Sequence, residues 1–198
     1  MTQPHLEAAC TNAEQSVPQG HDPRADSELP LSAPAPLPYL SRTALRKVKD
    51  RLPPPTQCPY CQGSVRLVTN DEIYRGRTYG NWPYAYLCDA CGATVGVHPG
   101  TDLPLGTLAD KALRAARNDA KAQFKQLMRL RALPRDDAYK WLANELGMTK
   151  QVCHFAWFDL DQCEAARAAC EAGARAATAM GAALLKAKAA QPKGGGTP

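Results

Sequence analysis

The amino-acid sequence predicts an α+β protein, with a small β-rich unit followed by a helical C-terminal region. Between residues 53 and 105, short runs alternate apolar and polar side chains and contain β-branched residues, a pattern typical of strands. From residue 106 onward, apolar residues recur at three- and four-residue steps, which is typical of helices that bury one face. Two cysteine pairs lie in the β-rich unit and suggest how so small a sheet is stabilised.

The N-terminal part, residues 1–52, is predicted to be a disordered, proline-rich tail that ends in a short basic segment. Residues 29–38 intersperse proline with small or apolar residues, a composition typical of extended linkers. Such a segment buries too little apolar surface to offset the entropy lost when it becomes ordered. Removing residues 1–40 is therefore not expected to lower the melting temperature.

The composition indicates a domain that needs more than an apolar core to stay folded. The chain has 198 residues and is 44% hydrophobic, but much of that fraction is alanine, and only three Phe and three Trp are present. Small domains with thin cores usually depend on a metal or on disulfides. Residues 1–15 contain no apolar run typical of a signal peptide, and no segment is long and apolar enough to span a membrane. These features predict a cytoplasmic protein whose thiols stay reduced.

Four of the eight cysteines form two C-x-x-C pairs, Cys58 with Cys61 and Cys88 with Cys91. Two thiolates three positions apart on a tight turn can reach one ion, and two such turns give tetrahedral coordination. We therefore predict one structural Zn²⁺ in a zinc ribbon that spans residues 53–105. Four thiolates leave no open position on the metal, so it is not expected to be catalytic. An iron–sulfur cluster is the alternative; the adjoining glycines and strands favour zinc. The predicted strands are residues 65–69, 84–88 and 94–98.

The helical region, residues 106–172, is expected to pack on the ribbon. Thr107 and Asp110 resemble a capping box at the start of its first helix. The predicted helices are residues 107–133, 136–146 with Gly147 as a left-handed cap, 149–158, and a fourth that begins at Asp159 or Asp161. The remaining cysteines of this region are expected to be buried as small apolar residues, namely Cys153, Cys163 and Cys170. Residues 173–198, rich in alanine, lysine and glycine, are expected to form a frayed tail.

Seven short motifs and one longer run together carry a family resemblance. The motifs are Cys58-Pro-Tyr-Cys61, Cys88-Asp-Ala-Cys91, Leu113-Arg-Ala-Ala-Arg117, Ala138-Tyr-Lys-Trp-Leu-Ala143, Leu146-Gly147, Cys153-His154 and Phe158-Asp159. With the run from Val95 to Asp110, which is the most specific part, they span about residues 57–170. This set resembles a family of uncharacterised zinc-finger-containing proteins from bacteriophages and prophage-bearing bacteria.

The resemblance implies a zinc-finger domain in a phage or prophage context, and it implies no particular activity. Members of that family tend to have Ala-His and Phe-Asp in the long helix. This chain has Ala120-Lys121 and Phe124-Lys125 there, which argues against a family-wide catalytic histidine at this point.

Two groups of basic residues suggest contact with DNA or RNA, since the net charge of +5 is concentrated in blocks on both sides of the cysteine region. The loop between the first two predicted strands interleaves aromatic rings, which can stack on unpaired bases, with arginines, which can bind phosphate. Its residues are Tyr74, Arg75, Arg77 and Tyr79. A basic stripe on the long helix is formed by Lys111, Arg114, Arg117, Lys121 and Lys125. The alternatives are a turn that packs its tyrosines on the ribbon and a solvated helix face.

These features predict a non-enzymatic, zinc-stabilised, nucleic-acid-binding accessory protein of phage or prophage origin. One alternative is an adaptor that docks on a host protein through the acidic helices of residues 136–172. Another is a nuclease that uses His98 with Asp102, although the closed metal shell and the lack of a second acidic cluster count against it. Residues 139–158 also fit a helix-turn-helix outline with Lys150, Gln151 and His154 facing a groove, but the acidic balance of this region counts against that reading.

Overall fold

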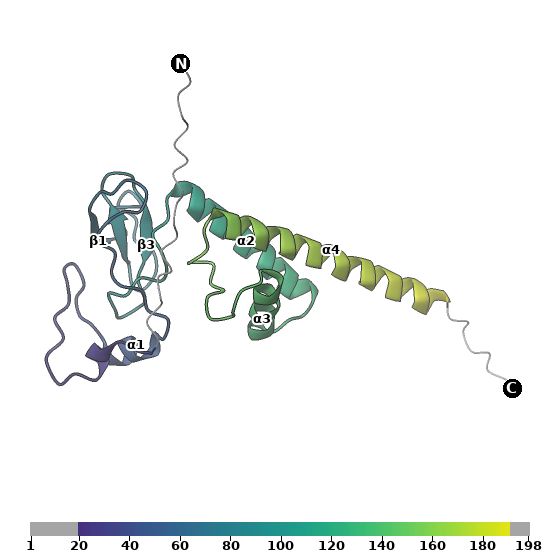
Figure 1. The fold of residues 1–198 in the computed structure, drawn as a ribbon, viewed down its shortest axis with the longest axis horizontal. Helices are drawn as coiled ribbons and strands as arrows, with labels where there is room; N and C mark the ends of the chain where they lie inside the picture. Colours follow the sequence, from purple (N-terminus) through teal and green to yellow (C-terminus); the bar gives the residue numbers. More distant parts are fainter. Residues whose placement is uncertain (1–19, 191–198) are drawn as a thin grey trace, which may run out of the picture.

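The computed structural model describes residues 20–190, which form three parts: an N-terminal segment, a three-stranded ribbon and a group of helices (Figure 1). The ribbon is followed by the helical region, so the predicted α+β architecture is confirmed. The segment before the ribbon is ordered, which the sequence did not predict.

The ribbon is an antiparallel sheet in the order β1-β2-β3. Its strands are β1 (Val65–Thr69), β2 (Tyr84–Cys88) and β3 (Thr94–Gly96). The register pairs Val65 with Cys88 at one end of the β1–β2 hairpin and Thr69 with Tyr84 at the other end. The first two strands lie where the sequence predicted them. The third is two residues shorter, because Val97 forms only an isolated bridge to the returning chain.

Two helices follow the ribbon, α2 (Lys111–Leu130) and α3 (Arg135–Glu145). The prediction that the first helix begins at Thr107 is wrong. Asp110 caps α2 instead, since its Oδ1 atom accepts a hydrogen bond from the Leu113 N–H at 2.7 Å. Gly147 follows α3 with a φ of 63°, the left-handed conformation that the sequence predicted there.

Residues 149–158 form turns rather than the predicted third helix, so the helix-turn-helix outline is also wrong. Three apolar side chains of this segment are buried in the helical core: Cys153, Phe155 and Phe158. Residues two positions apart, such as Cys153 and Phe155, do not share one face of a helix. A helix would therefore expose at least one of these three side chains, whereas the turns bury all of them.

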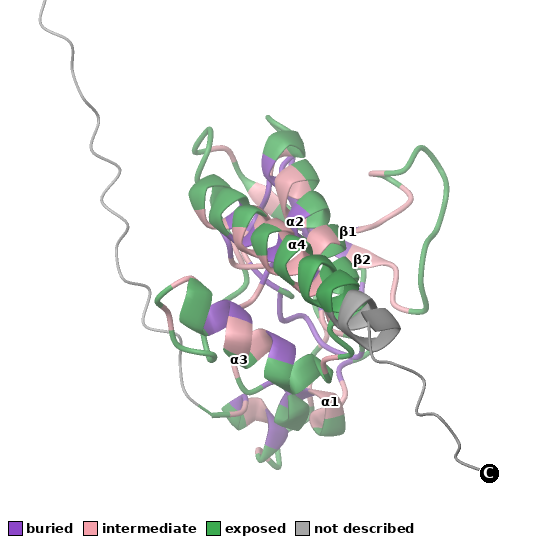
Figure 2. Ribbon diagram, turned by 90° about the vertical axis from the view of Figure 1, so that its right-hand side faces the viewer, coloured by how far each residue is buried: buried purple, intermediate pink, exposed green. Residues whose placement is uncertain are grey.

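Helix α4 (Leu160–Ala190) runs in the same direction as α2 and lies along it (Figure 2). Near the start of both helices, Arg117 of α2 donates to the carbonyl of Phe158. Further along, the Leu127 side chain of α2 lies against Gly173 of α4. The turns of residues 149–158 make this parallel arrangement possible, because they return the chain from the end of α3 to the start of α2.

The alanine-rich end of α4 projects beyond the other helices (Figure 1). The helix continues without a break to Ala190, so the prediction of fraying is wrong for residues 173–190; residues 191–198 lie outside the described part. Alanine has the highest intrinsic helix propensity, which accounts for a helix with few tertiary contacts. Within residues 20–190, no helix is both long and apolar enough to cross a membrane.

The three helices enclose an apolar core with Phe158, Leu127 and Leu142 among its fully buried side chains. The prediction for the three cysteines of this region is confirmed, since Cys153, Cys163 and Cys170 are all buried. Burial raises the pKa of Cys153 to about 11 and that of Cys170 to about 12. These thiols therefore stay neutral and pack as small apolar groups.

Residues 20–52 form an ordered strap on the ribbon, so the prediction of disorder is wrong for this segment; residues 1–19 lie outside the described part. The strap contains a 3-10 helix, η1 (Pro23–Ala25), and a short helix, α1 (Arg42–Lys47). Leu45 and Val48 are buried with Leu103 of the ribbon. The Ser41 N–H donates to the Gly100 carbonyl at 2.8 Å. The apolar side chains are scattered among prolines and charges, and the ribbon supplies the surface that buries them.

Arg24 joins the strap to the ribbon through two buried carboxylates. Its Nη1 and Nη2 atoms donate to Asp102 at 2.9 and 2.8 Å, and Nη2 also donates to Asp22 at 2.8 Å. Burial alone raises the pKa of Asp22, but the hydrogen bonds from Arg24 outweigh it and lower this pKa below its ordinary value. Asp22 therefore stabilises the fold at neutral pH, and that contribution is lost as the pH falls through its lowered pKa.

Replacing Arg24 with Met should lower the free energy of unfolding by about 2–4 kcal/mol at pH 7, because two buried carboxylates would lose their counter-charge. This loss of stability should be smaller in acid, because protonation of the carboxylates removes their unpaired charge. Urea unfolding at several pH values measures the difference in the free energy of unfolding. Lys140→Met is the control: its partners Asp136 and Asp137 are exposed, so the change should be much smaller than that of Arg24→Met. Equal effects of the two substitutions would contradict the role of Arg24.

Contrary to the sequence-based expectation, removing the strap should lower the melting temperature.

Candidate metal centre

The four cysteines lie on two turns with the same backbone hydrogen bonds. In the first turn, the Cys58 N–H donates to the Gly63 carbonyl and the Gln62 N–H donates to the Cys58 carbonyl, each at 2.9 Å. The second turn repeats this with Cys88, Ala93 and Gly92 in the corresponding places, again at 2.9 Å. The second turn follows β2 directly and the first precedes β1, so the hairpin brings both to the same end of the sheet.

The four sulfur atoms meet in a cluster that fits one metal ion. All four lie within 4.8 Å of one another. The sulfurs of Cys61 and Cys88 are 3.4 Å apart, and those of Cys58 and Cys91 are 3.5 Å apart. A tetrahedral site with Zn–S bonds of about 2.3 Å has sulfur–sulfur edges of about 3.8 Å, close to these distances. Cys58 and Cys88 are fully buried, whereas Cys61 and Cys91 face solvent.

Backbone N–H groups at the cluster favour charged sulfur. The N–H groups of Cys91 and Ala90 lower the pKa of Cys88 to about 7, although burial raises it. For Cys91 the balance is reversed: the Ala93 N–H lowers its pKa, but burial and the neighbouring sulfurs raise it to about 12. Four thiols at this spacing cannot all lose their protons unless a cation balances the charge. The cluster therefore has the chemistry of a metal-thiolate site.

The backbone of both turns needs residues that tolerate an unusual conformation or close contact. Gln62 and Gly92, at equivalent positions, have φ values of 60° and 71°, in the left-handed region. A Cβ atom at Gly63 would lie 3.0 Å from the Ala90 Cβ and 3.3 Å from the Cys61 sulfur. The glycine therefore lets the first turn lie close to the cluster.

Comparison with protein families agrees with this geometry. The model of the DUF3268 family, described as a zinc-finger-containing domain, matches residues 54–171. The chain belongs to this family. No curated protein and no solved structure matches it. Membership and the four-cysteine cluster together identify the ribbon as the metal-binding part of this zinc-finger-containing protein.

Arg114, predicted as part of a phosphate-binding stripe, links α2 to the second cysteine turn of the zinc-finger domain. Its Nη1 atom donates to the carbonyl of Ala109 at 2.7 Å, to Thr94 Oγ1 at 3.0 Å and to the Gly92 carbonyl at 3.3 Å. On the other turn, the Tyr60 hydroxyl donates to the Leu108 carbonyl at 3.1 Å. Both turns are thus connected to the segment that leads into α2.

Arg117, from the same predicted stripe, also makes contacts within the domain. Its Nε atom donates to the Phe158 carbonyl at 2.8 Å, and its two terminal nitrogens donate to the carbonyl and the hydroxyl of Thr107 at 3.0 and 2.6 Å. Burial lowers its pKa. Of the stripe, Lys111, Lys121 and Lys125 are the exposed members.

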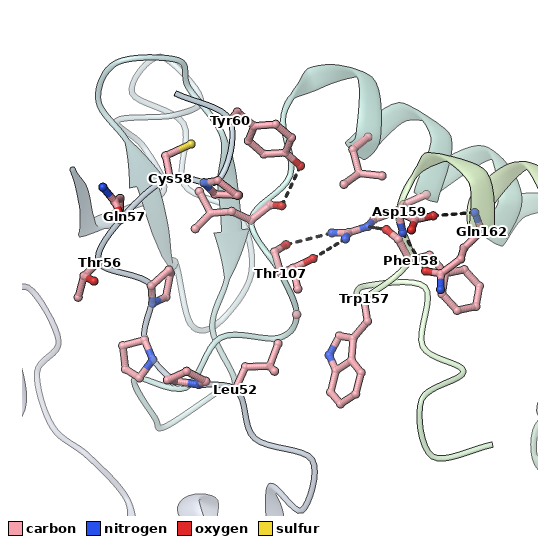
Figure 3. A pocket seen from close by; sticks show the side chains of 18 of the residues that line it. Leu52, Thr56, Gln57, Cys58, Tyr60, Thr107, Trp157, Phe158, Asp159 and Gln162 are labelled. Carbon is pink, nitrogen blue, oxygen red and sulfur yellow. Dashed lines mark hydrogen bonds between the residues drawn. The ribbon is translucent and has the colours of Figure 1, made fainter. Parts of the chain in front are cut away.

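A groove of about 870 Å³ separates the ribbon from the start of α4, and Figure 3 shows the residues that line it. Pro53, Pro54 and Pro55 and the half-exposed ring of Tyr60 form one side. Trp157 and Phe158 form the other side, with the hydrogen bonds of Arg117 between the two. The sequence did not predict this groove, because its two sides come from segments about a hundred residues apart.

The proposed nuclease pair, His98 and Asp102, is not arranged around a metal. The Asp102 carboxylate binds Arg24 with both oxygens. His98 is half-buried, and burial lowers its pKa. Among residues 20–190, the four cysteines are the one group of three or more potential ligands whose donor atoms converge.

The aromatic and basic loop lies at the end of the β1–β2 hairpin opposite the cysteine cluster. Here the structure brings together the predicted residues Tyr74, Arg75, Arg77 and Tyr79, which line one shallow hollow with Ile73. Sequence reasoning missed Asn70, which holds this loop closed. Its side-chain amide donates to the Tyr79 carbonyl at 2.8 Å, and its Oδ1 atom accepts from the Tyr79 N–H at 3.2 Å. The signal in the sequence was an asparagine directly after a predicted strand, a position typical of turns.

Proposed function

We propose that this zinc-finger-containing protein is a zinc-stabilised nucleic-acid-binding accessory protein, in which one Zn²⁺ is structural and the exposed arginines of the hairpin loop contact phosphate. The metal would be held by Cys58, Cys61, Cys88 and Cys91. Zinc supplies tetrahedral coordination without redox chemistry. The family description and the two matching glycine-assisted turns favour zinc over an iron–sulfur cluster.

The proposal of nucleic-acid binding rests on one observation, the exposure and pairing of the Arg75 and Arg77 side chains. Both side chains are exposed, and within residues 20–190 neither makes a hydrogen bond or an ion pair with another side chain. The three other arginines of the ribbon and of the first turns of α2 are engaged: Arg66 pairs with Glu72 and Asp89, and Arg114 and Arg117 make the hydrogen bonds described above. Unpaired guanidinium groups beside exposed aromatic rings are the combination that binds phosphate and base together.

The helix would contribute less than its sequence pattern suggests. Lys111 and Lys121 remain available for phosphate, whereas Arg114 and Arg117 are held by internal hydrogen bonds. The start of α2 lies near the cysteine end of the ribbon, away from the hairpin loop. We infer that the loop is the main contact and that the two lysines are auxiliary. The proposal also includes a phage or prophage origin and a cytoplasmic location, both of which we infer from the sequence alone.

Fluorescence anisotropy of the zinc-loaded protein with labelled oligonucleotides should show binding that weakens steeply between about 50 and about 200 mM salt. The double variant Arg75→Gln/Arg77→Gln should reduce the slope of log affinity against log salt by about 1.4 for single strands, because two phosphate contacts are lost. Arg129→Gln/Arg175→Gln removes the same charge from exposed positions on α2 and α4 and should leave the slope unchanged. No binding to DNA or RNA at the lower salt concentration would refute the proposal.

A second candidate function, docking on a host protein, is favoured by the groove between ribbon and helices. The groove is lined by aromatic and proline side chains of the kind found at peptide-binding sites: Tyr60, Pro53 and Pro54 are exposed, and Trp157 and Pro55 are partly exposed. The acidic helices first considered for this role are less suitable, since Asp136 and Asp137 pair with Lys140. Retention of a host protein by the wild type but not by Trp157→Ala would support this function.

A further inference from the structure

We propose that the hairpin loop, residues 70–80, is a site for one unpaired base, so that the protein binds single-stranded nucleic acid in preference to duplex. The proposal rests on the nucleic-acid-binding function proposed above and specifies its substrate class. It starts from the two tyrosines of the loop, Tyr74 and Tyr79.

The two tyrosine rings are exposed although they are not needed for the core of the ribbon. Tyr74 is 49% exposed and Tyr79 is 53% exposed. They contact each other edge to face, with ring centroids 4.9 Å apart and an interplanar angle of 81°. The core beneath the sheet is built from other aromatic residues, with Tyr86 buried and Trp82 and Tyr84 packed against it. The reading that these tyrosines complete a thin core is therefore not supported, and their exposed surface calls for another role.

The loop is held in one conformation before any ligand binds. Asn70 makes two hydrogen bonds to the backbone of Tyr79, and the N–H groups of Ile73 and Tyr74 both donate to the Asn70 carbonyl, at 3.1 and 3.0 Å. The Gly76 N–H donates to the Asp71 carbonyl at 2.8 Å. The turn itself needs left-handed backbone at Arg75 and Gly76, with φ values of 55° and 82°. Binding would thus cost little ordering entropy.

The hollow of the loop joins a stacking surface to positive charge. It has a volume of about 490 Å³ and is lined by Ile73, Tyr74, Arg75, Arg77 and Tyr79. The loop itself contains two acidic residues, Asp71 and Glu72, neither of which lines the hollow, and the charge of Glu72 is offset by its ion pair with Arg66. The arginines are therefore placed to hold the phosphate of a nucleotide whose base lies on a tyrosine ring.

Stacking on a tyrosine requires a base whose face is uncovered. In a duplex, each base is covered above and below by its neighbours, so a ring can reach it only at a strand end or after an unfavourable unstacking step. In a single strand the face is available, and stacking strengthens binding by about tenfold or more per base. The same loop would contact a duplex through its arginines alone.

The test compares a labelled single strand, as DNA and as RNA, with the blunt-ended duplex that the same strand forms with its complement, using the full-length zinc-loaded protein. Wild type should bind the single strands at least about tenfold more tightly than the duplex. Tyr79→Leu should weaken single-strand binding by about tenfold and leave duplex binding unchanged, whereas Tyr79→Phe, which keeps the ring, should stay within about twofold of wild type.

Tyr39→Leu is the matched control, because Tyr39 is also exposed (56%) and also packs edge to face, on Trp82, but lies on the strap. Its single-strand affinity should equal that of wild type. Zinc content and melting temperature, measured for every variant, show whether each one is folded.

Equal affinity for single strand and duplex, or equal losses of affinity for both substrates in Tyr79→Leu, would overturn the base site and leave the phosphate-binding function intact. Absence of binding to every oligonucleotide would instead refute the function itself.

Discussion

Cys88→Ser should leave the ribbon unfolded under conditions in which the wild type is fully folded. Cys88 is fully buried, its sulfur is one of the four in the cluster, and the residue ends β2 and pairs with Val65 of β1. Structural zinc binding contributes about 10–16 kcal/mol to the folding of small zinc-finger domains. This equals or exceeds the whole stability of a typical domain, about 5–15 kcal/mol, so loss of the site cannot be offset by the small apolar core of the ribbon.

Elemental analysis and thermal unfolding together measure this effect. The variant should bind less than one zinc per chain and lose the cooperative transition of the ribbon. Cys170→Ala provides the control: it also removes a buried sulfur, but in the helical core, so it should keep the metal and lose only about 1–3 kcal/mol of stability. A Cys88→Ser protein with unchanged zinc content and melting temperature would rule out the proposed metal site.

Gly106→Ala should destabilise the junction between the ribbon and the helices by about 3 kcal/mol or more. A Cβ atom at this position would overlap the Ala156 carbonyl oxygen and lie 2.7 Å from the carbonyl carbon. These are backbone atoms, and the same carbonyl accepts a hydrogen bond from the Thr107 N–H at 3.0 Å. The two segments would have to separate, which would also disturb the hydrogen bonds of Arg117.

Urea unfolding of Gly106→Ala should be compared with that of Gly181→Ala. Gly181 lies in the projecting part of α4, and a Cβ atom there would meet nothing within 4 Å. The same substitution should therefore stabilise this helix by about 0.5–1 kcal/mol, because alanine loses less backbone entropy than glycine. A Gly106→Ala protein as stable as wild type would show that the two segments do not pack as closely as described.

The cysteine site and the strands of the hairpin could be predicted from sequence because their signals are local. C-x-x-C spacing places two sulfurs on one turn, and alternation in residues 65–69 and 84–88 places side chains on two faces. The long helix and the buried thiols of Cys153, Cys163 and Cys170 follow in the same way from the periodicity of apolar residues. None of these predictions required knowledge of what lies across the fold.

The features that the sequence did not predict depend on contacts between distant segments. The strap has prolines and charges typical of a disordered tail, and its order depends on Asp102, 78 residues after Arg24. Arg114 and Arg117 have the spacing of a basic helix face, but carbonyl groups from outside the helix take up their donors. Turns replaced a helix in residues 149–158 because the core buries both Cys153 and Phe155, which are two positions apart and would lie on different faces of a helix.

The strap also shows that the segment shared by the family is shorter than the segment that folds as one unit. The family match begins at residue 54, after the strap, and ends at residue 171. Yet Tyr39 of the strap packs on Trp82, and Gly173 lies so close to the Trp141 ring that a Cβ atom added to the glycine would be 3.2 Å from it. Trimming the chain to the shared segment would uncover both tryptophans and leave Asp102 without Arg24. The shared segment contains the four cysteines, and the neighbouring segments cover two of its tryptophans.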